Sequence, residues 1–393
     1  MSGTIKLGGI LAGSLGAVAI LWFTLALPWP TASLGNRYQL WSASLVVSLT
    51  LLCFTFELSW RNMLRLLGVL VLLGSILGRL AVIQFLEGDK TPLDKSNIFA
   101  ILSEQGSLGI ITLGAALLIL TGGIDLSVGS VVGLAAVAFG TLMEMGCPPL
   151  AALGIVLLLG VVIGFTNGLL VTQLKLQSFL VTLCGMFMFR GFARAINTSN
   201  TGLQQAKSNH PEFAESLDSM RALLVGKAAN GAVEFPATLV VMMLLAAVVA
   251  VILHKSAYGR YWFAIGYNDQ AARYAGIGVE RQRLAVFVIC STLAAFAGIL
   301  LLLWGGSANP SNAGNSYELY AITAAVLGGV SLKGGECIAA GLILGALVQP
   351  IIFNWMSFDQ IPDSAQLWVM GLALLSGTIA DELIRRFRRR AKG

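Results

Sequence analysis

The chain has 393 residues, of which 56% are hydrophobic and only 11% are charged. A soluble protein carries about 25% charged residues, so this composition excludes a soluble globular domain and is typical of a chain that crosses a membrane many times. The formal charge of +6 does not indicate nucleic-acid binding, because the basic residues lie in loops and at the C-terminus, where they orient the chain and contact anionic lipid.

Apolar stretches of membrane-spanning length recur along the whole chain. About 20 apolar residues cross the hydrocarbon core as a helix. The sequence therefore predicts an all-α polytopic membrane protein with about 10–12 transmembrane helices. The predicted spans are residues 7–27, 40–58, 63–86, 98–121, 127–144, 148–172, 178–197, 236–254, 284–304, 319–333, 336–355 and 365–382. The first is too long for a typical signal peptide and is expected to remain as an anchor.

A glycine-rich segment with one carboxylate separates the spans 98–121 and 127–144. It reads Thr121-Gly-Gly-Ile-Asp-Leu-Ser-Val-Gly-Ser130. A charge at the bilayer centre costs about 2.5–3.5 kcal/mol on insertion scales, and irregular backbone at that depth occurs only where protein or water covers it. We therefore expect a helix broken near the midplane that lines a path, formed by Gly122, Gly123, Asp125, Ser127 and Gly129.

Asp125 has three possible roles. It can accept hydrogen bonds from backbone N–H groups where the next helix starts near Ser127, or from the hydroxyl groups of a solute. It can also carry a proton in a proton- or ion-coupled secondary transporter, with Glu104 and Glu144 as accessory groups. Other intramembrane polar residues are expected to be structural: Arg190 and Arg194 to reach the interface or pair, and Asn167 to donate a hydrogen bond between helices.

A second glycine-rich segment resembles the first. Gly122-Gly-Ile-Asp-Leu-Ser-Val-Gly129 can be aligned with Gly328-Gly-Val-Ser-Leu-Lys-Gly-Gly335, and each follows an apolar stretch. Internal repeats with broken helices that meet at the substrate path are common in transporters. The sequence therefore indicates a possible internal repeat, with Gly328 and Gly329 in the second break.

Charges in the loops predict the orientation. The segment between Leu253 and Leu284 is rich in basic residues, as is the C-terminal tail, and both are expected in the cytoplasm. The segment from Asn197 to Glu234 is polar and nearly charge-balanced, and is expected outside. An even number of spans then places both termini in the cytoplasm.

The sequence predicts neither catalytic nor metal-binding residues. The five cysteines include no CxxC pair and the two histidines, His210 and His254, are far apart, so no metal or redox site is indicated. A GxxxxGK[ST] phosphate loop does not occur in the sequence, so ATP, if it is used, must be bound by another chain. No cofactor is expected in this chain.

The segment Tyr258–Gln282 is the predicted docking site for such an ATPase. A turn at Gly259 and Arg260 leads to a short helix that starts at Asn268 and ends at Arg273, with Gly276 as its stop. Ala271 and Ala272, with Ala275, would offer a small face to a groove of the partner. The alternative is an ordinary amphipathic cytoplasmic loop.

Several motifs, in order, resemble one known family. They are Ser96-Asn-Ile-Phe, the Asp125-Leu-Ser-Val-Gly block, Gly164-Phe-Thr-Asn-Gly168, Ser178-Phe-Leu-Val-Thr182, Tyr258-Gly-Arg, Asn268-Asp-Gln-Ala-Ala-Arg273 and Ala324-Ala-Val-Leu-Gly-Gly329. The chain resembles the permease subunits of bacterial ABC importers for monosaccharides of the ribose, xylose and galactose type. The resemblance covers about three quarters of the chain, from Ser96 onward.

The resemblance implies a function and partners. It implies that the chain carries a monosaccharide or related polyol across the inner membrane, that a separate ABC ATPase moves the helix at Asn268–Arg273, and that a periplasmic sugar-binding protein delivers the solute. It also implies a homodimer or heterodimer of permeases embedded in lipid. Residues 1–62, about two helices, are extra relative to the family, which leaves 63–393 as the permease domain. Tyr320 and Glu336 depart from the usual pattern, which leaves the sugar open.

Overall fold

The computed structural model describes residues 95–227 and 235–337, together with residues 341–342, 345–346, 368–369, 371–372, 374–375 and 378. The chain divides into two compact units, and nearly all described residues belong to the second unit, Leu93–Pro350. The predicted spans 7–27, 40–58 and 63–86 and the division at residue 62 lie outside the described residues, as do most residues of the spans 336–355 and 365–382.

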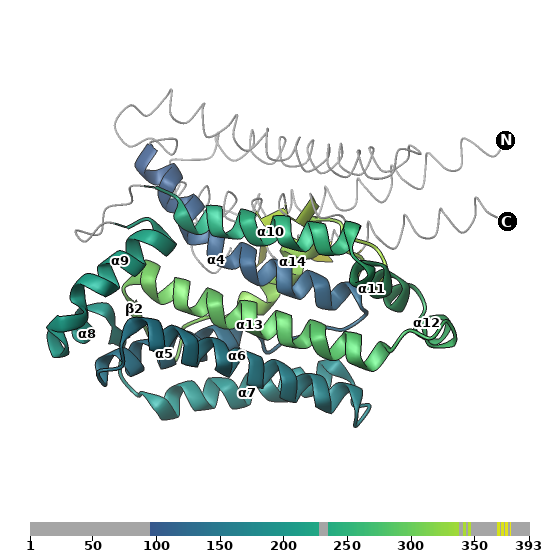
Figure 1. The fold of residues 1–393 in the computed structure, drawn as a ribbon, viewed down its shortest axis with the longest axis horizontal. Helices are drawn as coiled ribbons and strands as arrows, with labels where there is room; N and C mark the ends of the chain where they lie inside the picture. The colour runs from purple at the N-terminus through teal and green to yellow at the C-terminus, as the bar shows by residue number, and fades with distance from the viewer. Residues whose placement is uncertain are drawn as a thin grey trace, which may run out of the picture. The chain divides into compact units, whose positions relative to one another are not determined.

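Long helices dominate the second unit and run side by side along its long axis (Figure 1). They are α4 (Lys95–Leu120), α5 (Val128–Glu144), α6 (Pro149–Thr172), α7 (Ser178–Ile196), α10 (Ala237–Lys255), α13 (Val279–Gly305) and the shorter α14 (Tyr317–Leu327). Within the described residues, α6, α7, α10 and α13 are long and apolar enough to cross a membrane, and α5, α14 and the Gly106–Leu120 part of α4 are shorter apolar helices. The predicted all-α, polytopic fold is confirmed.

Short elements occupy the two ends of the bundle. One end carries α8 (Leu203–Asn209), η2 (Pro211–Phe213), α9 (Ala214–Val225) and the two-residue strands β1 (Thr201–Gly202) and β2 (Ser307–Ala308), which pair antiparallel with Thr201 opposite Ala308. The other end carries α11 (Ala257–Tyr267) and α12 (Asp269–Tyr274). We call these the α9 end and the α12 end.

Two predicted spans differ from the observed helices. The span 284–304 begins earlier, at Val279, so Arg281 and Arg283 belong to α13 instead of a loop. The span 319–333 is wrong, because α14 ends at Leu327 after only 11 residues. Gly329 has φ +87° there, a conformation that ends helices and that glycine adopts without strain.

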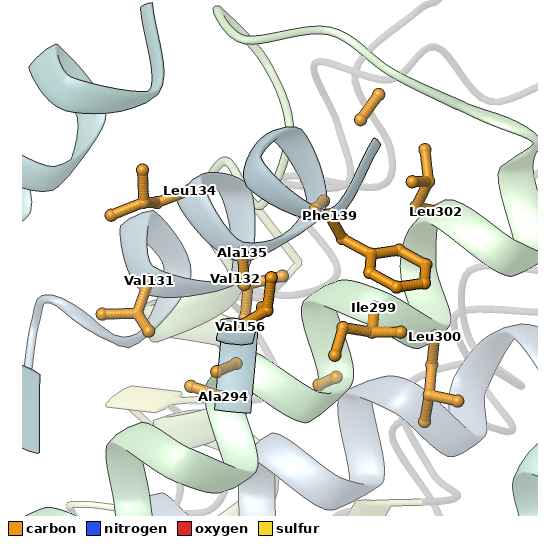
Figure 2. Close-up of a cluster of buried hydrophobic side chains, with 14 of the residues drawn as sticks. Val131, Val132, Leu134, Ala135, Phe139, Val156, Ala294, Ile299, Leu300 and Leu302 are labelled. Atoms are coloured by element: carbon orange, nitrogen blue, oxygen red, sulfur yellow. The ribbon is translucent and has the colours of Figure 1, made fainter. Parts of the chain in front are cut away.

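The core lies where α13 crosses its neighbours. Helix α13 packs against α4, α5 and α6, and Figure 2 shows its side chains meeting those of α5 and α6. The buried side chains there include Val132, Phe139, Val156, Ile299 and Leu302. In water, burial of one such side chain contributes about 1.5–3 kcal/mol relative to exposure. Between helices in a bilayer, where the surroundings are also apolar, close packing stabilises the contact instead.

Three glycines spaced four residues apart bring α6 close to α13. A Cβ atom on Gly164 would lie 2.6 Å from both the Phe287 carbonyl oxygen and the Val288 Cα, and one on Gly160 would lie 2.9 Å from the Ser291 carbonyl oxygen. On Gly168 it would approach Phe287 Cβ at 3.2 Å. Only glycine permits this approach, as in other membrane helix pairs with small residues every four positions.

The α9 end is tied to the long helices by polar contacts. Glu144, at the end of α5, accepts hydrogen bonds from the Thr201 hydroxyl at 2.7 Å and from the Gly202 N–H at 2.8 Å. Lys227 donates to the Trp304 carbonyl oxygen at 2.7 Å and lies 3.7 Å from the centre of that ring. The described part of the segment expected outside, residues 197–227, is therefore a small helical module fixed to α5 and α13.

Candidate functional site

The break between α4 and α5 begins with a helix-ending turn. Gly122 has φ +83°, its N–H donates to the Ile119 carbonyl at 2.9 Å, and the Gly123 N–H donates to the Leu118 carbonyl at 3.0 Å. These two bonds satisfy carbonyl groups that a helix end leaves without partners. The glycines are therefore required by the local backbone.

Asp125 organises the start of α5. Its Oδ1 atom accepts hydrogen bonds from the Ser127 N–H at 2.7 Å and from the Ser127 hydroxyl at 2.5 Å. Asn167 on α6 donates to the same hydroxyl at 3.3 Å. The geometry is that of the expected helix-start acceptor, and Asn167 is the expected donor between helices.

The break is held on its other side by α7. The Ile124 N–H donates to the Ser178 hydroxyl at 3.4 Å, and the Leu126 N–H donates to the Thr182 hydroxyl at 3.1 Å. Asp125 itself is 4% exposed, and its Oδ2 atom has no hydrogen-bond partner among the described residues. Asp125 is thus covered by protein, as expected for a carboxylate at this depth.

The break lies toward the α12 end. Ser127 contacts Asn167, which is five residues from the end of α6 at Thr172; at 1.5 Å per residue this is about 7–8 Å. Glu144 lies at the opposite end of α5, about 25 Å away for a helix of this length, and is bonded to β1. The structure therefore does not bring Glu144 to Asp125, and the side chain of Glu104 lies outside the described residues.

The second glycine-rich segment repeats the helix-ending turn of the first. Gly329 has φ +87°, its N–H donates to the Val326 carbonyl at 2.9 Å, and the Val330 N–H donates to the Ala325 carbonyl at 3.0 Å. In the structure Gly122 therefore corresponds to Gly329, whereas the sequence alignment pairs it with Gly328. The segments also meet, since the Gly335 N–H donates to the Leu120 carbonyl at 2.9 Å.

The α11 helix begins differently from the prediction. The predicted turn at Gly259 is wrong, because the turn lies at Ser256, whose hydroxyl accepts from the Gly259 N–H at 3.3 Å. Gly259 is in the first turn of α11 and is buried against the carbonyl groups of Ile252 and Leu253. Arg260 is exposed beside it.

The predicted short helix at Asn268–Arg273 is confirmed as α12. The Asn268 side chain accepts from the Ala271 N–H at 3.0 Å, and Gly276, with φ +80°, follows the helix. Ala272 does not belong to the predicted exposed face of small residues, because it is buried with Ile265 and Val279. Ala271 is exposed, as predicted. One side of α12 therefore anchors it to the bundle and the other side is open.

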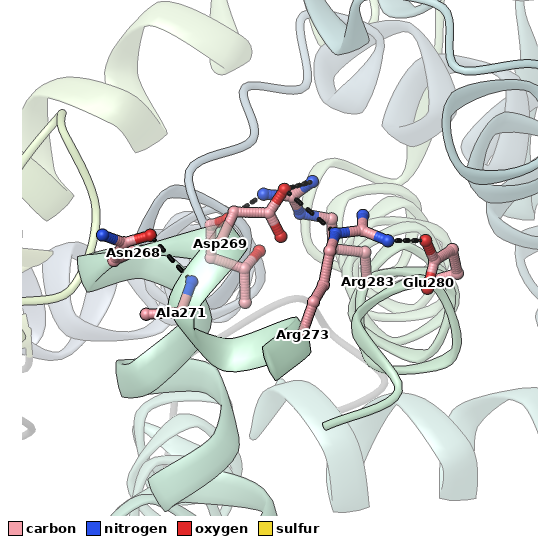
Figure 3. A network of polar contacts seen from close by, with 7 residues as sticks. Asn268, Asp269, Ala271, Arg273, Glu280 and Arg283 are labelled. Atoms are coloured by element: carbon pink, nitrogen blue, oxygen red, sulfur yellow. Dashed lines mark hydrogen bonds and ion pairs between the residues drawn. The ribbon is translucent and has the colours of Figure 1, made fainter. Parts of the chain in front are cut away.

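Ion pairs fix α12 to the start of α13 (Figure 3). Arg273 donates a hydrogen bond to Glu280, and its Nε atom lies 3.6 Å from Asp269 Oδ2. The hydrogen bond to Glu280 raises the pKa of Arg273 above its ordinary value, so this guanidinium is charged at neutral pH.

Arg283 joins α12 to the break. Its Nη1 atom lies 3.6 Å from Asp269 Oδ2, and its Nη2 atom donates to the Thr121 carbonyl at 3.4 Å. The sequence identified Arg283 only as one of several orienting charges. Its partner Thr121 is 162 residues away in the sequence, so no local sequence pattern predicts this contact.

Comparison with known proteins assigns the family. Residues 97–376 match the family described as branched-chain amino acid transport system / permease component. That match covers well over half of the chain. The chain belongs to this permease family.

Curated relatives of the permease include bacterial ribose and xylose permeases. The ribose import permease protein RbsC of Escherichia coli K12 is 33% identical over 289 residues, which cover 73% of this chain and 85% of that protein. The xylose transport system permease protein XylH of the same strain is 31% identical over 345 residues, covering 76% and 88%. The inner membrane ABC transporter permease protein YjfF is 33% identical over 261 residues, covering 66% and 75%. No solved structure matches the chain.

Proposed function

We propose that the permease is the membrane subunit of an ATP-driven importer that carries a monosaccharide or a related small polyol across the inner membrane. The names of the ribose and xylose relatives support the solute class, and their similarity extends over most of both chains. ATP would be bound and hydrolysed by a separate ABC ATPase, because the sequence of this chain has no phosphate loop.

The α12 segment carries this proposal. Its buried side is anchored through Ala272. Tyr267, the last residue of α11, is 83% exposed, and Tyr274, the last residue of α12, is 92% exposed. Exposed tyrosines of this kind are enriched where proteins bind one another, because they bury a large area and still offer a hydroxyl group. The ATPase would bind to the exposed side of α12.

Arg283 connects the proposed docking site of the ATPase with the break between α4 and α5. Movement of α12 displaces Asp269, and Arg283 contacts both Asp269 and the Thr121 carbonyl at the end of α4. A shift of α12 would therefore be transmitted to the segment that starts α5. The path is one of direct contacts between two elements that move relative to each other.

The partners would occupy opposite ends of the bundle. The ATPase binds at the α12 end in the cytoplasm, and a periplasmic sugar-binding protein delivers the solute at the α9 end. Two permease subunits, identical or different, would enclose the solute path, with lipid around them and with both termini of each chain in the cytoplasm.

Two variants test the docking proposal against a matched control. Replacing residues 268–273 with a Gly/Ser linker should abolish ATP-coupled uptake, and Tyr274→Ala should reduce co-purification of the P-loop ATPase. Leu223→Ala, which removes a side chain that is 76% exposed at the α9 end, should leave ATPase recovery unchanged. Normal uptake with the linker in place would contradict the coupling role of α12.

A proton-coupled secondary transporter is the second candidate, and the free Oδ2 atom of the buried Asp125 favours it. Such a protein works alone and follows the proton gradient. Purified permease that accumulates a sugar in proteoliposomes under a pH gradient, without an ATPase, would establish this alternative.

A further inference from the structure

The segment 309–316, between β2 and α14, is irregular and polar. Its Asn309 side chain accepts from the Ser311 N–H at 2.8 Å, and the segment passes along α5. A Cβ atom on Gly133 would meet the Ala313 carbonyl, and one on Gly314 would lie 2.9 Å from the Gly133 nitrogen. Glycines on both sides therefore allow the segment to lie directly against α5.

This contact places the segment deep within the bundle. Gly133 lies 11 residues, and Gly129 lies 15 residues, before the end of α5 at Glu144. At 1.5 Å per residue, Ala313 and Gly314 are about 16–22 Å from the α9 end of that helix. A hydrocarbon core is about 30 Å thick, so with the α9 end of α5 at one membrane surface this irregular backbone would lie inside the core.

Exposed polar side chains occur at this depth. Ser311, Asn312 and Asn315 are all exposed. Arg190 on α7 donates from its Nη1 atom to Asn315 Oδ1 at 3.0 Å, and its Nη2 atom has no partner among the described residues. Arg190 was expected to pair or to reach the interface, and here it pairs with an irregular segment in mid-bundle.

Two contacts confirm the depth of Arg190. Helix α7 runs parallel to α5, since Gly185 packs on Ser127 at the start of α5 and Asn197 donates to the Thr141 hydroxyl near its end at 3.4 Å. Arg190 lies between these two points. An arginine at such depth is costly unless it faces protein or water.

Glu318 completes the group from the first turn of α14. It is 7% exposed, it lies within electrostatic reach of Arg190, and its Oε2 atom has no hydrogen-bond partner among the described residues. This atom packs against Gly129 at the start of α5. Glu318 therefore lies behind the exposed residues of the segment, and the buried Asp125 is also within electrostatic reach of it.

We propose that Arg190, Asn312 and Asn315, with Glu318 packed behind them, line the aqueous path and that the two asparagines and the arginine hydrogen-bond to the hydroxyl groups of a neutral polyhydroxylated solute. Lipid cannot cover the surface formed by the segment 309–316 and Arg190 without a large cost in free energy. The backbone of this segment is irregular and the side chains are polar. Asparagine and arginine side chains together supply the donors and acceptors that sugar hydroxyls need. The inference rests on the proposed importer and assigns its path to residues outside the two glycine-rich breaks.

Thiol labelling in membrane vesicles that contain the assembled importer tests the path. Asn312→Cys and Asn315→Cys are treated with a membrane-impermeant, charged methanethiosulfonate reagent, and the labelling of the parent chain is subtracted. The matched control is Leu158→Cys, at the middle of α6 and 62% exposed on an apolar face. A thiol must ionise in water to react, so labelling should be about tenfold faster or more at both asparagine positions than at the control.

Uptake of ribose provides a second readout. Arg190→Gln should reduce ATP-driven uptake by about tenfold, and Arg190→Lys should restore part of it, because lysine keeps the charge but loses the planar fork of donors. Labelling as slow as that of Leu158→Cys, in vesicles with intact ATP-driven uptake, would overturn the path and leave the importer standing. Failure of the importer itself is a different result, namely no ATP-driven uptake by the unmodified chain.

Discussion

Asp125 is the most informative single residue, and its contacts are local. One oxygen accepts both Ser127 donors, and the surrounding hydroxyls of α7 satisfy the neighbouring backbone N–H groups. A carboxylate used in this way shapes the start of α5, where negative charge is also favoured by the helix dipole. The charge itself is not needed for the two observed hydrogen bonds.

Asp125→Asn therefore should preserve both fold and transport. The amide oxygen can accept the same two hydrogen bonds as Oδ1, whereas Asp125→Ala removes the acceptor and should cost about 1 kcal/mol of stability, as for other helix caps. Thermal unfolding in detergent and ATP-driven uptake check both variants. A stable Asp125→Asn protein that no longer transports would instead identify Asp125 as a proton carrier.

Sequence predicts the residue contacts that are local and misses those that are distant. Asn268 and Gly276 were identified because a helix start and a helix stop depend on neighbours within a few positions. Arg283 was identified only as an orienting charge and Glu318 was assigned no role, because their contacts with Thr121 and Gly129 join segments far apart in the chain. A carboxylate that follows a polar turn within an apolar region is the signal that could have singled out Glu318.

At the scale of elements, apolar length located most helices but not their ends. The predicted starts and ends of α5, α6, α7 and α10 agree within one residue with those observed, because these helices are bounded by turn-forming residues. The prediction failed where an apolar run continues past a left-handed glycine, as at the end of α14. It failed again at Gly259, where glycine serves close packing instead of a turn.

The α6–α13 contact makes a prediction about glycine. Gly164→Leu places a side chain where a Cβ atom alone would lie 2.6 Å from the α13 backbone, so the helices must separate. Overpacking of this kind costs on the order of 1–3 kcal/mol, and we expect a clear drop in the midpoint of thermal unfolding in detergent. Gly154→Leu, on the same helix, is the control, because a Cβ atom there meets nothing within 4 Å. Equal stability of both variants would contradict the close crossing.

At the scale of the whole molecule, the two ends of the bundle have different chemistry. The α12 end carries exposed tyrosines and the ion pairs around Arg273, whereas the α9 end is a helical module held by Glu144 and Lys227. Helix α10 connects them and is long enough to cross a membrane. The two ends therefore offer different surfaces for binding.

Charge predicts which end of the bundle lies in the cytoplasm. The residues from Lys255 to Arg283 carry more basic than acidic side chains, and such segments stay in the cytoplasm. Ser219→Cys, on α9, should react with an impermeant thiol reagent in intact spheroplasts, whereas Gln270→Cys, on α12, should react only after the membrane is permeabilised. The reverse pattern would place α12 outside, where no ATPase can reach it, and would exclude the docking proposal. Gly393→Cys, protected in the same way as Gln270→Cys, would support the predicted cytoplasmic position of the C-terminus.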